Sequence, residues 1–125
     1  MFNRFTLRAL QVLFYARAEV SKMGSSAVEP EHILLGVLDE GKGLPCQILA
    51  RTGGTLDDVR SGVVRRLTRR ETVHESDEIP FSASSQRVLE HAAEEAARLL
   101  HNHIDTEHLL LGLLREERSI AAEAW

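Results

Sequence analysis

Cysteine, aromatic residues and long apolar runs are all scarce in this sequence of 125 residues. The single cysteine, Cys46, has no partner for an intramolecular disulfide, which excludes a small secreted scaffold held by disulfide bonds. No segment approaches the ~20 consecutive apolar residues of a membrane-spanning helix. The first four residues lead directly into a helical pattern rather than into an export signal. We therefore expect a cytoplasmic protein with no membrane partner.

The sequence also lacks an excess of positive charge. Its 15 Lys and Arg residues are outnumbered by 19 Asp and Glu residues, for a formal net charge of −4, so a nucleic-acid partner is not expected. The arginines between positions 60 and 70 fall near the C-terminus of a predicted helix, where the helix dipole favours cations. With 43% hydrophobic residues, the composition indicates one folded domain over residues 1–125.

Motifs for catalysis and for cofactors are missing as well. The glycines near positions 41 and 53 do not have the Gly-x-x-x-x-Gly-Lys-Ser/Thr spacing of a phosphate-binding loop. A cluster at 101–108 contains three histidines and two carboxylates but matches no strong zinc pattern, so we predict an exposed loop there. No nucleophile with a matching base is recognisable. We expect no enzyme activity, no cofactor and no metal.

What the sequence does contain is an internal duplication. A shift of 76 positions aligns residues 5–49 with residues 81–125 without a gap, and 12 of these 45 pairs are identical. The identities concentrate in a motif, Glu-His-x-Leu-Leu-Gly-x-Leu, at 31–38 and again at 107–114. The chain is therefore predicted to hold two copies of one helical repeat: repeat one at 5–70, a linker at 71–80 and repeat two at 81–125.

Each repeat is predicted to open with a long helix. Leu10, Leu13, Phe14 and Val20 recur at spacings of three and four, which predicts one buried face on a helix over 6–23. Thr6 and Gly24 suit the two ends of this helix. Its counterpart over 82–100 begins with a capping serine at position 82.

The remaining segments are also helical in pattern, so the predicted fold class is all-α with a pseudo-twofold relation between the halves. The motif predicts helices over 31–40 and 107–116, and two further helices follow at 44–51 and 55–69. A short separate helix is expected near the C-terminus, and the second repeat lacks residues for its fourth helix. Leu110, Leu113 and Leu114 should then be less covered than their partners in the first repeat, which favours self-association.

The opening segment Arg4–Leu13, the two Glu-His-x-Leu-Leu-Gly motifs and the duplication together resemble the N-terminal repeat domain of Clp-type AAA+ unfoldases, in particular the ClpC branch. The resemblance implies a bundle of two four-helix repeats, here truncated in the second. Such a domain receives protein substrates and adaptor proteins at a Clp ATPase ring or Clp protease. ATP hydrolysis belongs to other domains of these proteins.

In ClpC-like domains the resemblance further implies two sites for phosphoarginine, a degradation mark. Glu31 and Glu107 would bind its guanidinium group, because a carboxylate accepts paired hydrogen bonds from a guanidinium. Thr6 and Ser82 correspond to the hydroxyl that opens a helix, whose N-terminus suits a phosphate. Arg4 is predicted to add charge to a first site made with Thr6 and Glu31. Its counterpart in the second site is Pro80, so the first site should bind more tightly.

Two alternatives stay open at this stage. Acidic residues such as Glu31 and Glu107 are favoured in the first turn of a helix whatever their function. The histidines of the motif, His32 and His108, are interpreted as structural, hydrogen-bonded residues without a chemical role. For the whole chain, the alternative to a docking module of a Clp unfoldase is a stand-alone Clp-like domain that acts as an interaction or regulatory protein with a different ligand.

Overall fold

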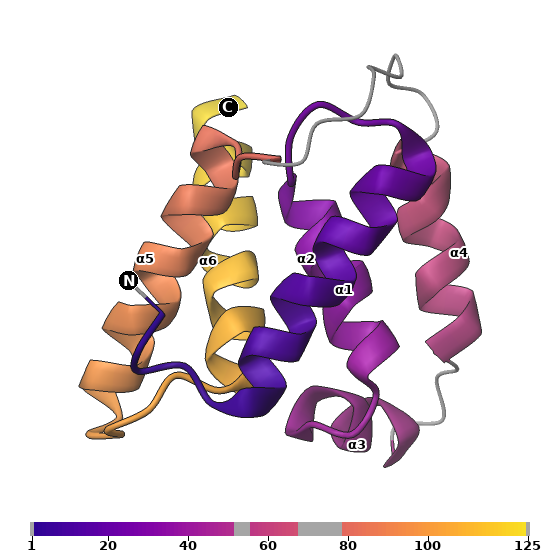
Figure 1. The fold of residues 1–125 in the computed structure, drawn as a ribbon. Helices are drawn as coiled ribbons and strands as arrows, with labels where there is room; N and C mark the ends of the chain where they lie inside the picture. Colours follow the sequence, from indigo (N-terminus) through magenta and orange to yellow (C-terminus); the bar gives the residue numbers. More distant parts are fainter. Residues whose placement is uncertain (1, 52–55, 68–78, 125) are drawn as a thin grey trace.

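The computed structural model, shown in Figure 1, describes residues 2–51, 56–67 and 79–124. Within these residues it has six helices and two isolated β-bridges but no strand, which confirms the all-α class. The helices are α1 (Leu7–Met23), α2 (Pro30–Glu40), α3 (Leu44–Arg51), α4 (Leu56–Leu67), α5 (Ala83–Arg98) and α6 (Thr106–Ala124). The predicted linker lies outside the described residues except for Ile79 and Pro80. None of the described helices combines the length and apolarity needed to cross a membrane.

The first five helices begin and end within two residues of their predicted bounds because their caps are readable in the sequence. The Thr6 hydroxyl accepts a hydrogen bond from the Ala9 N–H (3.2 Å), and the Ser82 hydroxyl accepts one from the Ser85 N–H (3.1 Å). Gly24, with φ of 68°, provides the left-handed residue after α1.

The end of α6 differs from the prediction of a helix over 107–116 followed by a short separate one. α6 runs without a break from Thr106 to Ala124. The duplication explains the difference. α2 ends at Gly41 (φ 71°), whereas the aligned residue in the second repeat is Glu117, which favours the helix. Pro45 likewise aligns with Ala121, so nothing in the second repeat stops the helix at the corresponding place.

The predicted buried face of α1 is wrong for Leu10 and Phe14, whose side chains are 39% and 71% exposed. The close approach of α1 to α2 explains the difference. A Cβ added to Gly36 of α2 would lie 2.2 Å from the Val12 carbonyl oxygen of α1, so the two backbones touch there. This contact turns Val12 and Ala16 inward and the Leu10 and Phe14 side outward. The full set of buried α1 residues is Ala9, Val12, Leu13, Ala16, Glu19 and Val20.

The second half repeats this packing. A Cβ on Gly112 of α6 would lie 2.4 Å from the Val88 carbonyl oxygen of α5, so the motif glycine again allows two helices to meet closely. Figure 1 shows the α5 and α6 pair on one side and α1, α2 and α4 on the other. One apolar core joins the halves. Its fully buried members are Ala9, Val12, Ala16, Val20, Val28, Ile33, Val88, Ala92, Ala96 and Leu109.

Candidate functional site

The segment before α1 crosses over to the opposite half of the molecule. The Thr6 N–H donates to the Ile104 carbonyl (2.9 Å), and the Ile104 N–H donates to the Arg4 carbonyl (2.9 Å). Because Ile104 lies two residues before α6, the N-terminus of α1 is held beside the N-terminus of α6.

The segment before α5 makes the reciprocal crossing. The Ser82 N–H donates to the Val28 carbonyl (3.0 Å), and the Val28 N–H donates to the Pro80 carbonyl (2.8 Å). Every residue of this crossing aligns with one of the first crossing in the duplication. The N-terminus of α5 is therefore held beside the N-terminus of α2, as a twofold relation between the halves requires.

The first crossing forms a site that we name the α1–α6 site: Arg4, Thr6, Asp105 and Glu107. The Thr6 hydroxyl donates to an Asp105 carboxylate oxygen (2.7 Å), and the Arg4 Nε donates to the carbonyl of Asn102 (3.3 Å). Glu107 follows two residues after Asp105, in the first turn of α6, and is partly buried. A cation, the N-terminus of α1 and the Asp105 carboxylate thus lie together, and Glu107 follows in the first turn of α6.

The second crossing forms the α5–α2 site: Ser82, Ser85, Glu29 and Glu31. The Ser85 hydroxyl donates to the Val28 carbonyl (2.7 Å), which fastens α5 to the segment before α2. Glu31 lies in the first turn of α2. Pro80 occupies the position that Arg4 has at the other site, so no cationic side chain is supplied there by the crossing segment.

The predicted grouping of Arg4 and Thr6 with Glu31 is corrected by these contacts. The hydrogen bonds of Arg4 and Thr6 go to residues 102–105, immediately before Glu107. The cause is the crossing itself: the segment before each long helix pairs with the segment before the motif helix of the other repeat, not of its own. The same argument places Ser82 with Glu31 instead of Glu107.

The motif histidines shape the first turn that carries each glutamate. His32 is fully buried and its Nδ1 accepts the Glu29 N–H (2.9 Å), while Nδ1 of His108 accepts the Asp105 N–H (2.8 Å). The Nε2 of His108 therefore carries the proton and donates to Nδ1 of His101 (2.8 Å). Burial lowers the pKa of His108, which keeps the ring neutral. Both rings act as structural caps. Among the residues described, no His, Cys, Asp and Glu cluster is suited to hold a metal.

An apolar pocket of ≈410 Å³ borders the α1–α6 site. Two of its lining residues, Phe5 and Ile104, directly precede Thr6 and Asp105, so the pocket and the site share an edge. The Arg17 guanidinium lies over the Phe81 ring, 4.8 Å from its centre. The lining residues are Phe2, Phe5, Phe81, Gln86, Leu89, Glu90, Ala93 and Ile104. Sequence analysis missed this pocket, although the aligned pair Phe5 and Phe81 was a signal for it.

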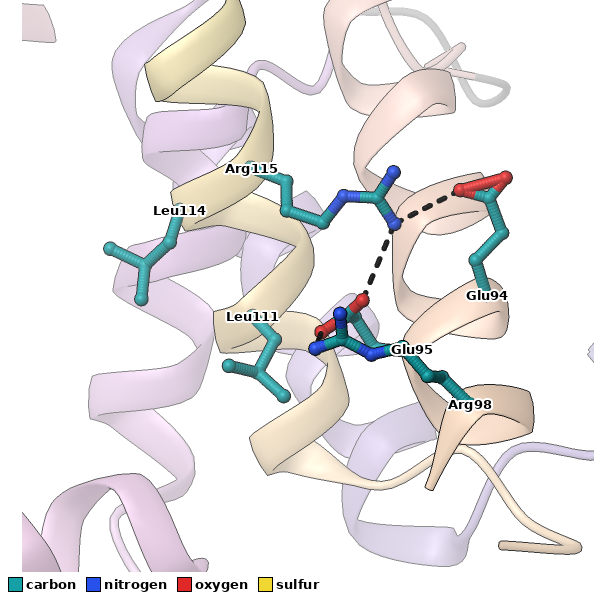
Figure 2. Close-up of a pocket in the computed structure, with 6 residues that line it drawn as sticks. All are labelled: Glu94, Glu95, Arg98, Leu111, Leu114 and Arg115. Atoms are coloured by element: carbon teal, nitrogen blue, oxygen red, sulfur yellow. Dashed lines mark hydrogen bonds and ion pairs between the residues drawn. The ribbon is translucent and has the colours of Figure 1, made fainter. Parts of the chain in front are cut away.

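A second groove, of ≈580 Å³, lies between α5 and α6. Figure 2 shows Arg115 reaching from α6 toward the carboxylates of Glu94 and Glu95 on α5. Leu111 and Leu114, also on α6, complete the groove together with Arg98.

In the first half, α4 covers the equivalent place. Val63 of α4 packs against Leu35, which is fully buried, whereas the aligned Leu111 is only partly buried. Leu113 and Leu114 are also less covered than their aligned partners, as predicted, and Leu114 is 47% exposed. Leu110 does not follow the prediction, since it and its aligned partner are both partly buried.

The two halves also differ in the residue that supplies a positive charge to the buried glutamate of the long helix. In the first half, Arg60 of α4 reaches Glu19 (2.7 Å) and Asp39. Burial alone would raise the pKa of Glu19, but its hydrogen bond and ion pair with Arg60 lower it. Burial and the adjacent Glu19 raise the pKa of Asp39 to about 6, against the effect of Arg60. In the second half Asp39 aligns with Arg115, which supplies from α6 a cation for the buried Glu95 (3.4 Å).

Comparison with known proteins assigns the chain to a family. The model of the Clp repeat (R) N-terminal domain family matches residues 4–125. Chaperone protein ClpC1, chloroplastic, of Arabidopsis thaliana is 43% identical over 122 residues, which are 98% of this chain and 13% of that protein. The chain thus spans about 13–15% of the length of the curated relatives that it matches.

Solved structures with a similar fold include N-terminal domains of Clp proteins. The N-terminal domain of ClpD from Arabidopsis thaliana is 28% identical with a TM-score of 0.71, and the match covers 90% of this chain and 77% of that one. A ClpV N-domain solved in complex with a VipB peptide has a TM-score of 0.72 at 16% identity, covering 91% of this chain and 69% of that one. The second likeness concerns the fold alone.

Proposed function

Because the chain belongs to the Clp repeat N-terminal domain family, we propose that it is a docking module for protein substrates and adaptor proteins of a Clp-type ATPase. The observation that supports this most is the pair of reciprocal sites, each of which brings a helix N-terminus to a motif glutamate. Both sites hold groups suited to binding a charged ligand, and the module is proposed to bind without catalysing. A Clp ATPase ring or a Clp protease is its proposed partner.

We further propose phosphoarginine as a ligand of the α1–α6 site. Phosphoarginine joins an anionic phosphate directly to a cationic guanidinium, so its site needs donors and carboxylates side by side. Arg4 and the first backbone N–H groups of α1 would hold the phosphate. The Thr6 hydroxyl already donates to Asp105, so it positions that carboxylate. Asp105 and Glu107 would then accept the guanidinium.

The α5–α2 site is proposed to bind the same ligand more weakly. Glu31 and the N-terminus of α5 repeat the arrangement, but Pro80 brings no charge where the other site has Arg4. A missing cation weakens the binding of a phosphate, because it removes a charge-assisted hydrogen bond with the anion.

The apolar pocket beside the α1–α6 site would make binding depend on the residue next to the phosphoarginine in the substrate. An apolar side chain next to a phosphorylated arginine would enter the space between Phe2, Phe5 and Phe81 while the mark is bound. The proposed substrate is therefore a phosphoarginine with an apolar neighbour, exposed on an unfolded segment.

The test is a titration of free phosphoarginine, followed by NMR shifts and calorimetry, with free arginine as the control ligand. Glu107→Ala removes a charge-assisted pair worth ~1.5–3 kcal/mol, so affinity at the α1–α6 site should fall by roughly ten- to a hundredfold. Glu31→Ala should weaken only the α5–α2 site. Glu117→Ala removes an exposed glutamate of α6 outside both sites and should change neither affinity.

Two results would contradict the proposal for this ligand. One is an absence of shifts at millimolar phosphoarginine, and the other is unchanged binding by the double variant of Glu31 and Glu107. Either result would favour the alternative function, a stand-alone Clp-like domain that acts as an interaction or regulatory protein with a different ligand.

A further inference from the structure

Two histidine rings are hydrogen-bonded to each other beside the α1–α6 site. Nδ1 of His101, in the loop between α5 and α6, accepts the Nε2 proton of His108 (2.8 Å). The two rings meet edge to face, with their centres 5.0 Å apart. His108 is 2% exposed, whereas His101 is exposed. A ring that water reaches is therefore bonded to a ring that water does not reach.

The His101–His108 pair holds the segment that carries the α1–α6 site. Nδ1 of His108 accepts the Asp105 N–H (2.8 Å), so this ring is fixed to the start of α6. The residue after His101 is Asn102, whose carbonyl accepts the hydrogen bond from Arg4 (3.3 Å). The pair thus joins the loop after α5 to the first turn of α6, next to the group that anchors Arg4.

The hydrogen bond between the two rings exists in one protonation state. Because the Asp105 N–H occupies Nδ1 of His108, the proton of this neutral ring is on Nε2, and Nδ1 of His101 must be bare. A proton added to Nδ1 of His101 would place two N–H groups opposite each other, and the bond would be lost. The buried N–H of His108 would then have lost its acceptor, which is unfavourable for a buried donor.

The surroundings of the pair direct an added proton to His101. The charged groups that face the pair are Arg4 from the segment before α1, Glu95 from α5, and Asp105 and Glu107 from the start of α6. Burial lowers the pKa of His108, although the nearby carboxylates act in the opposite direction. His101 is exposed, so its ring can carry a positive charge at a lower cost. A histidine side chain in water changes its charge between about pH 5 and pH 8.

We propose that the His101–His108 pair is a proton-sensitive latch of the α1–α6 site, in which His101 is a positioning residue. The neutral ring of His101 holds the first turn of α6 in place, and the protonated ring releases it. This inference rests on the proposed function, since the bound phosphoarginine needs Asp105 and Glu107 in that turn. The arrangement that binds the ligand carries one proton fewer than the released one, so affinity at this site falls as the pH falls.

The α5–α2 site lacks the exposed half of this pair. It keeps the buried cap, His32, which is fully buried. At the position aligned with His101, however, the first repeat has Ser25, whose hydroxyl does not titrate in this pH range. The latch therefore belongs to one of the two sites, and the other site is an internal reference for it.

The experiment measures phosphoarginine affinity at both sites of the 125-residue chain by NMR, at about pH 7.5 and about pH 5.5. The affinity ratio of the two sites is compared, because protonation of the ligand itself acts on both. Affinity at the α1–α6 site should fall about two- to tenfold relative to the α5–α2 site, which corresponds to the loss of one hydrogen bond. Without ligand, the N–H shifts of Asn102 and Asp105 should change with the same midpoint as the ring shifts of His101.

Two variants of His101 separate a proton-sensitive role from a structural one. His101→Asn replaces Nδ1 by an amide oxygen, which accepts a hydrogen bond but does not titrate. This variant should keep the affinity that the α1–α6 site has at high pH and lose the pH dependence of the ratio. His101→Ala should bind weakly at both pH values. The control His103→Asn changes an exposed histidine two residues away and should leave the pH dependence as it is.

Three results would overturn the latch. One is an affinity ratio that is the same at both pH values, another is a pH dependence that persists in His101→Asn, and the third is a pH dependence that His103→Asn removes. If phosphoarginine bound neither site at either pH, the function proposed above would fail, and the shifts measured without ligand would decide on the latch. A common midpoint that disappears in His101→Asn would support the latch, and one that persists would exclude it.

Discussion

Leu100 adopts a left-handed backbone conformation, with φ of 60°, at the position where the first half has Gly24 with φ of 68°. The two residues are aligned in the duplication and follow the two long helices. A left-handed conformation costs a residue with a side chain roughly 1–2 kcal/mol and costs glycine little. The Leu100 side chain is 90% exposed, so it recovers almost nothing by packing.

Leu100→Gly should therefore raise the free energy of unfolding by about 0.5–1 kcal/mol, because the relief of strain exceeds the added flexibility of the unfolded chain. Urea denaturation measures the change. The matched variant, Gly24→Ala, should lower the same quantity by about 1 kcal/mol. A lower stability of Leu100→Gly would show that Leu100 makes a contact that its exposure conceals.

The capping residues could be predicted from the local sequence, whereas the residues that make up each site could not. Thr6 and Ser82 lie directly before apolar helical patterns, and each caps its helix as expected. By contrast, Arg4 is about equally compatible with Glu31 and with Glu107 in the sequence, because the duplication makes both glutamates equivalent. Only the crossing of the chain, which is a long-range feature, decides between them. The prediction that Phe14 is buried failed because α1 has large apolar residues on both of its faces.

At the scale of the helices, one cation of α4 joins it to two other helices. Arg60 reaches Glu19 and Asp39, which belong to α1 and α2. Glu19 is 3% exposed, and a buried carboxylate without a counter-charge is strongly unfavourable. In the second half the described residues supply that cation from α5 and α6 themselves, through Arg98 (2.9 Å) and Arg115.

Arg60→Ala should consequently lower the free energy of unfolding by about 2 kcal/mol, because it removes the close cation from the buried Glu19 and leaves the longer contact to Lys22. Arg115→Ala should cost less, under about 1 kcal/mol, since Arg98 still pairs with Glu95. Arg65→Ala, an exposed change on the same helix as Arg60, is the control and should cost clearly less than Arg60→Ala. Guanidinium chloride titrations of the three variants would compare them. Equal costs for Arg60 and Arg115 would contradict the role given to α4.

The helices themselves were largely predictable because their ends carry recognisable residues, and α6 shows what happens without them. Gly41 ends α2, and no glycine stands at the aligned position 117. The expectation of a break came from the symmetry of the repeat, while the local residues favoured a continuous helix. Local propensity decided the outcome there.

For the whole molecule, the two repeats share one core. Val12 and Val20 of α1 belong to the same buried cluster as Val88 and Leu109 of the second half. The two crossing segments add reciprocal backbone hydrogen bonds between the halves. A sequence built from two copies could fold as two independent units. The shared core and the exchanged segments instead indicate one cooperative unit.

Cooperativity of this kind predicts that a local change in one half destabilises both. Gly36→Ala places a Cβ 2.2 Å from the Val12 carbonyl oxygen, which forces α1 and α2 apart and should cost about 1–3 kcal/mol. Hydrogen exchange should then show an equal loss of protection in both halves. Protection in the cores of α5 and α6 should fall by about the same factor as in α1 and α2, which is roughly tenfold or more. For the control Gly62→Ala, the nearest neighbouring atom among the described residues lies 4.0 Å from the added Cβ, so this variant should stabilise slightly, because alanine favours a helix over glycine. If Gly36→Ala left the protection of α5 and α6 unchanged, the halves would unfold separately. The crossing segments would then connect two independent units, and the two proposed ligand sites would open as either half unfolds.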